Sequence, residues 1–102
     1  MTPYEIARQW YEDHPQPFTF SHYLIENALH GFVFITPDFF IMGYPKPDCW
    51  HVVFASGDLS KAWSILPYHL PYISFERVRD GKLDLTVMPI ERMRKLSEIA
   101  AL

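Results

Sequence analysis

Apolar residues recur along the chain at two different spacings, and the spacing separates helices from strands. A period of three to four residues predicts four amphipathic helices, over residues 3–14, 21–30, 59–66 and 90–100. Short runs rich in Phe, Ile and Val, or alternating with polar residues, predict five strands, over residues 32–35, 39–42, 50–55, 72–78 and 83–87.

Local signals mark the ends of the predicted helices. Thr2 precedes Pro3 and Glu5, and Asp58 follows a strand and a glycine, so each is a good N-cap. The second helix is expected to begin at Ser21 and to end at Gly31 in a left-handed conformation. We expect its buried stripe to consist of Leu24, Ile25, Ala28 and Leu29.

The order of these elements predicts one α+β domain over residues 1–102. The first two strands form a hairpin, and Asp80-Gly81 predicts a second hairpin because both residues tolerate a positive φ. Between them, the strand–helix–strand segment 50–78 predicts a right-handed crossover with two parallel strands. The expected sheet is therefore mixed and five-stranded, with two N-terminal helices, one crossover helix and a C-terminal helix.

This order over residues 2–78 resembles the first two-thirds of the GNAT acyltransferase superfamily. The segments 29–34, 39–45, 50–59 and 70–77 are also similar in texture to small phage-encoded proteins of GNAT-like type. In that family, acyl-coenzyme A sits where two parallel strands splay. The resemblance implies an acetyl-coenzyme A site at Ser56, Gly57 and Lys61, with an amine as acceptor and weak or absent N-acyltransferase activity.

The stretch that should bind the pyrophosphate departs from the family pattern. GNAT enzymes carry Arg/Gln-x-x-Gly-x-Gly/Ala there, so that backbone N–H groups can approach phosphate. This chain has one glycine in Ala55-Ser56-Gly57-Asp58-Leu59-Ser60-Lys61, and the Asp58 carboxylate would occupy the N–H groups and repel phosphate. The alternative interpretation is a structural helix cap.

One acid–base set can be assembled if the crossover is correct. Glu76 and His51 would lie on adjacent parallel strands, and Tyr72 or Tyr68 could supply a proton to a leaving group. These residues are the catalytic candidates. The alternatives are a solvated strand face and a buried histidine that a neighbour satisfies.

The single cysteine, Cys49, excludes an intramolecular disulfide and fits a reducing cytoplasm. It lies two residues before His51, so both side chains point to one face of a strand. The pattern favours a packed pair over a reactive thiolate, because Asp48 would oppose the thiolate charge. The five histidines are scattered, and their spacing predicts no metal site.

Aromatic residues make up 17% of the chain, which is high for 102 residues. We expect some aromatic rings to lie at the surface, in a homodimer interface or against a protein partner. The alternative interpretation is that these rings form a surface on which a ligand stacks. The net charge of -3 argues against nucleic acid as the main ligand. A C-terminal basic cluster keeps nucleic acid as a further alternative, comprising Arg77, Arg79, Lys82, Arg92, Arg94 and Lys95. No signal peptide or membrane span is expected.

Overall fold

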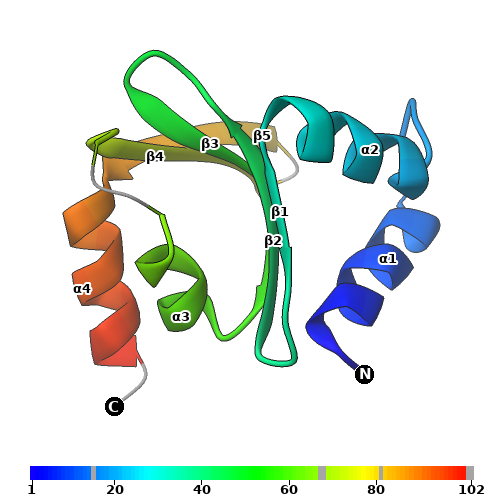
Figure 1. Cartoon of the computed structure of the whole chain (residues 1–102), viewed down its shortest axis with the longest axis horizontal. Helices are drawn as coiled ribbons and strands as arrows, with labels where there is room; N and C mark the ends of the chain where they lie inside the picture. Colours follow the sequence, from blue (N-terminus) through cyan, green and yellow to red (C-terminus); the bar gives the residue numbers. More distant parts are fainter. Residues whose placement is uncertain (15, 67–68, 81, 101–102) are drawn as a thin grey trace.

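A computed structural model gives the fold of residues 1–14, 16–66, 69–80 and 82–100, and describes the backbone but not the side chains of residues 77–79, 82–83, 97 and 100. The chain runs through two helices, three strands, one helix, two strands and a last helix (Figure 1). Their bounds are α1 Pro3–Asp13, α2 Phe20–His30, β1 Phe32–Ile35, β2 Phe39–Pro45, β3 Cys49–Gly57, α3 Leu59–Ser64, β4 Tyr72–Arg79, β5 Lys82–Pro89 and α4 Ile90–Ala100.

The five strands form one sheet in the order β1-β2-β3-β4-β5. β1, β2 and β3 pair antiparallel, β3 and β4 pair parallel across the α3 crossover, and β4 and β5 form an antiparallel hairpin. The α+β class and the mixed five-stranded sheet predicted from the sequence are confirmed. Asp80 has a φ of 51°, as its predicted hairpin turn requires, whereas Gly81 lies outside the described residues.

Helices cover the two faces of the sheet unequally. On the first face, α1 packs against β2 and β3, and α2 packs against β1 and β2. On the second face, α3 packs against β2 and β3, and α4 packs against β4 and β5. Figure 1 shows α1 and α2 on one side of β1–β3 and the other two helices on the opposite side.

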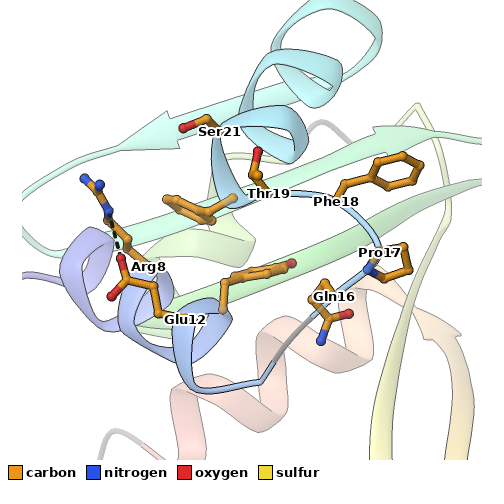
Figure 2. A pocket seen from close by; sticks show the side chains of 9 residues that line it. Arg8, Glu12, Gln16, Pro17, Phe18, Thr19 and Ser21 are labelled. Atoms are coloured by element: carbon orange, nitrogen blue, oxygen red, sulfur yellow. Dashed lines mark ion pairs between the residues drawn. The ribbon is translucent and has the colours of Figure 1, made fainter.

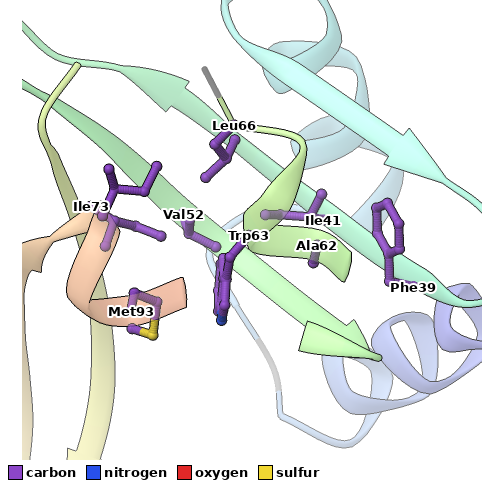
Figure 3. Close-up of a cluster of buried hydrophobic side chains, with 9 residues drawn as sticks. Phe39, Ile41, Val52, Ala62, Trp63, Leu66, Ile73 and Met93 are labelled. Atoms are coloured by element: carbon purple, nitrogen blue, oxygen red, sulfur yellow. The ribbon is translucent and has the colours of Figure 1, made fainter. Parts of the chain in front are cut away.

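Each face has its own hydrophobic core. On the second face, Trp63 of α3 lies between strand residues such as Val52 and Ile73 and the α4 residue Met93 (Figure 3). On the first face, Phe40 and Met42 of β2 pack against Ala7 of α1 and Phe20 of α2. The sheet therefore separates an α3/α4 core from an aromatic α1/α2 core.

Two predicted helix caps are present. Thr2 accepts a hydrogen bond from the Glu5 N–H at 3.1 Å and begins α1. Asp58 accepts one from the Lys61 N–H at 3.3 Å and begins α3. Both oxygens satisfy N–H groups that a helix start otherwise leaves without a partner.

The buried stripe predicted for α2 is wrong except at Leu24, which packs against the first-face core. The helix begins one residue earlier, with Thr19 as its cap, and it buries Phe20 and Asn27. Ile25 and Leu29 are instead 59% and 71% exposed. Gly31 is not left-handed, because its φ is -149°. Position 31 needs a glycine for a different reason, because a Cβ there would collide with the Gly43 carbonyl oxygen.

Candidate functional site

The parallel pairing of β3 and β4 brings the three catalytic candidates to one face of the sheet. His51 lies opposite Ser74 in the register. Because side chains alternate along a strand and Ile73 and Phe75 join the second-face core, Tyr72, Ser74 and Glu76 point to the first face. His51, Tyr72 and Glu76 therefore surround Ser74. Tyr68, the other candidate proton donor, lies outside the described residues.

A buried chain of polar side chains joins β3 to β4. The Ser74 hydroxyl lies 2.9 Å from His51 Nδ1 and 3.5 Å from Cys49 Sγ. All three residues are buried, and the Tyr44 ring lies 5.0 Å from the His51 ring between centroids. Sequence reasoning found His51 and Cys49 but missed Ser74, because only the parallel register places Ser74 beside them.

Burial lowers the pKa of His51 below its ordinary value of 6.5, and the positive charge of Lys46 lowers it further. The carboxylate of Glu76 acts in the opposite direction and is the smaller effect. His51 is therefore neutral near pH 7. Because Ser74 occupies Nδ1, proton exchange with a ligand would go through Nε2.

Replacing His51 by asparagine is expected to make the free energy of unfolding depend less on pH below 6.5. As the pH falls through 6.5, the unfolded chain binds a proton that the folded protein still excludes. The free energy of unfolding therefore decreases as the pH falls, until the lowered folded-state pKa is reached. Urea unfolding of both proteins on either side of pH 6.5 measures this. Parallel stability curves for the two proteins would contradict the lowered pKa.

The residues predicted to hold acetyl-coenzyme A contact other parts of the chain. Ser56 Oγ donates to the Pro3 carbonyl at 2.6 Å, and Lys61 Nζ pairs with Asp38 Oδ2 at 3.1 Å. Gly57 has a φ of 88°, and a Cβ on it would collide with the Asp38 carbonyl oxygen. That carbonyl also accepts from the Asp58 N–H at 2.8 Å. Structural contacts thus close the turn between β3 and α3.

A cleft of about 410 Å³ lies where α1 meets α2, at a place that sequence reasoning did not single out. Figure 2 shows Phe18 and Pro17 on the connecting loop, with Arg8 and Glu12 on α1. Arg8 Nε pairs with Glu12 Oε1 at 3.4 Å, so the two charges offset each other. Burial and the neighbouring Tyr23 raise the pKa of Tyr11 in this cleft to about 12. A ligand in this cleft would therefore meet polar and aromatic side chains, and little net charge.

Two residues of the basic C-terminal cluster, Arg94 and Lys95, make contacts within the fold. Arg94 donates to the backbone carbonyls of Trp63, Ser64 and Leu66, and so ties α4 to the end of α3. Lys95 pairs with Glu91 at 3.7 Å. The side chains of Arg77, Arg79 and Lys82 lie outside the described residues. In the described part, these contacts favour a structural role over a role in binding nucleic acid.

The registers also align a row of first-face residues across four strands. Tyr44 lies opposite His51, His51 opposite Ser74, and Ser74 opposite Val87. Leu85 lies opposite Glu76 in the next row. Leu85 and Val87 are 54% and 55% exposed, and Tyr44 and Tyr72 are also exposed. We call the four residues Tyr44, Tyr72, Leu85 and Val87 the open face.

Among the described residues, no three or more His, Cys, Asp or Glu side chains gather in a way that could hold a metal ion. In the same part of the chain, every helix is too short or too polar to cross a bilayer. Neither the family models nor the curated proteins nor the solved structures give a match to the chain. The resemblance to the GNAT superfamily therefore stays a prediction.

Proposed function

We propose that this chain is an interaction module that binds protein through the open face. The observation that carries the proposal is the exposure of Leu85 and Val87 on the first face of β5, whereas α1 and α2 pack against β1–β3 on that face. An apolar sheet face is stable in water when another layer covers it. Exposed apolar surface of this kind marks protein contacts more often than it marks small-molecule sites.

The surroundings of the open face also favour binding over catalysis. Ser74 and Cys49, the two side chains with nucleophilic chemistry at this place, are buried. Their hydrogen bonds to one another and to His51 hold β3 against β4. We infer that this buried chain fixes the register, so that Val87 and Leu85 are presented on a rigid surface.

Site-specific photo-cross-linking tests the proposal. A photoreactive amino acid in place of Val87 is expected to give a covalent adduct of higher mass in cells that produce the protein. The matched control carries the same group in place of Ile99, which is exposed on α4 away from the open face. An adduct from the Val87 position alone supports the proposal. No adduct, or equal adducts from both positions, would contradict it.

A second candidate function is weak N-acyltransferase activity with acetyl-coenzyme A. The parallel pair of β3 and β4 joined through α3 favours it, as does the grouping of His51, Tyr72 and Glu76 on one face. In this proposal, Glu76 and His51 take the proton of an amine acceptor and Tyr72 protonates the leaving thiolate. The contacts of Asp58 and Asp38 in the closed turn weigh against it.

Isothermal titration calorimetry separates the two functions. Because Asp58 and Asp38 occupy the N–H groups of the turn and Lys61 is paired, we expect no binding heat with acetyl-coenzyme A at millimolar concentration. A saturable heat in the folded protein, lost in Lys61→Ala but kept in the control Lys95→Ala, would favour the acyltransferase over the interaction module.

A further inference from the structure

We propose that the partner of the open face is a second copy of this chain, whose helix α2 seats on β4 and β5. This inference rests on the proposed function and names its partner. The contact is reciprocal, so α2 of each copy covers the open face of the other. A two-fold arrangement of this kind closes on itself and gives a dimer.

The outer side of α2 carries an apolar stripe that is largely exposed in the described part of the chain. Ile25 and Leu29 lie four residues apart, so they point the same way, and they are more than half exposed. The exposed Ala28 lies beside them. Burying both large side chains in an interface would remove their exposed apolar surface from water, which favours association.

The open face has the dimensions of one helix. β4 and β5 together span about 10 Å across the sheet, and a helix with its side chains is about 10 Å wide. α2 has 11 residues and is therefore about 16 Å long, which fits within the length of an eight-residue strand. A helix seated there would complete the first-face layer, where α1 and α2 cover only β1–β3.

Charges at the edges of the two surfaces are complementary. Lys46 and Glu76 flank the open face, since both act electrostatically on His51. Glu26 and His30 flank the stripe on α2, where they pair weakly at 3.8 Å while well exposed. Docking can therefore place Glu26 of one copy near Lys46 of the other. Such rim pairs set the orientation more than the affinity.

The area of the contact predicts a weak dimer. The stripe and the open face together offer on the order of 400 Å² per copy, from the dimensions of a helix and of two strands. Stable protein complexes bury about 800 Å² per partner. The dissociation constant is therefore expected in the micromolar range.

Sedimentation equilibrium over low-micromolar to near-millimolar concentration tests the dimer. The wild type is expected to self-associate, and Val87→Lys and Leu29→Lys are each expected to weaken association at least tenfold. Ile99→Lys is the matched control, because it places the same charge at an exposed apolar position outside both surfaces. Circular dichroism confirms that each variant is folded, and Ile25→Lys repeats the test on α2.

A charge exchange tests the orientation of the two copies. Glu26→Lys and Lys46→Glu are each expected to weaken the dimer, and the double variant is expected to restore it. If the wild type stays monomeric while Val87 cross-links to a different protein, the proposed dimer is wrong, whereas the proposed protein-binding function is supported. If the wild type stays monomeric and Val87 gives no adduct, both fall. Equal association of the wild type and all variants would also overturn the inference.

Discussion

Gly43→Ala is expected to destabilise the protein by roughly 3 kcal/mol or more, near the upper end for overpacking a closely packed site. Gly43 lies in the middle of β2, at the place where its register with β3 shifts. A Cβ there would collide with the backbone carbonyl oxygen of His51 and would lie 2.9 Å from Phe32 Cζ. The carbonyl cannot move without disturbing the β2–β3 pairing, so the strain falls on the centre of the sheet. Chemical denaturation of both proteins measures the loss.

A second substitution separates the two obstacles at Gly43. Phe32→Ala removes the flexible ring tip, so it would rescue Gly43→Ala if the ring were the main obstacle. We expect no rescue, because the His51 carbonyl remains in place. An alanine variant as stable as the wild type would contradict the close approach of β2 and β3.

Trp63→Ala is expected to cost roughly 3–5 kcal/mol, which is the range for truncating a large buried aromatic side chain. Trp63 is buried at the centre of the second-face core, where α3, α4 and the sheet meet. Its removal leaves a cavity that Val52, Ile73 and Met93 cannot fill without repacking. A domain of this size has only about 5–15 kcal/mol in total, so the variant is expected to be partly unfolded at 37 °C.

Trp10→Ala is the matched control for Trp63. Trp10 lies on α1 and is partly exposed, with its ring stacked on His14 at 4.4 Å. We expect its truncation to cost less than half as much, because much of its surface already contacts water. Thermal unfolding of both variants checks the order. An equal loss from the two would contradict the placement of the core around α3.

The sequence predicts the element order and the topology because the signals for them are local. Thr2 and Asp58 cap helices through side chains within three residues of the N–H groups that they satisfy. The alternation of Ile73 and Phe75 with Ser74 indicates which face of β4 joins the apolar second-face core. A strand, a short helix and a strand then allow one favoured connection, which is the parallel pair.

The candidate site is less predictable because it depends on contacts distant in sequence. Ser74 meets His51 only through the β3–β4 register, and Asp38 closes the α3 turn from a different hairpin. The error at α2 has a related cause. Leu24, Ile25, Ala28 and Leu29 form an apolar stripe in either orientation, and packing of Phe20 and Asn27 decides which side faces the sheet.

Amide chemical shifts measured over a range of protein concentration test most directly whether the open face is a docking surface. We expect the amides of Tyr72, Leu85 and Val87 to shift together with those of Ile25 and Leu29 as the concentration rises, along one common binding curve. Amides of α4 around Ile99 should stay unchanged. Shifts confined to α4, or a spectrum that does not change with concentration, would contradict self-docking through the open face.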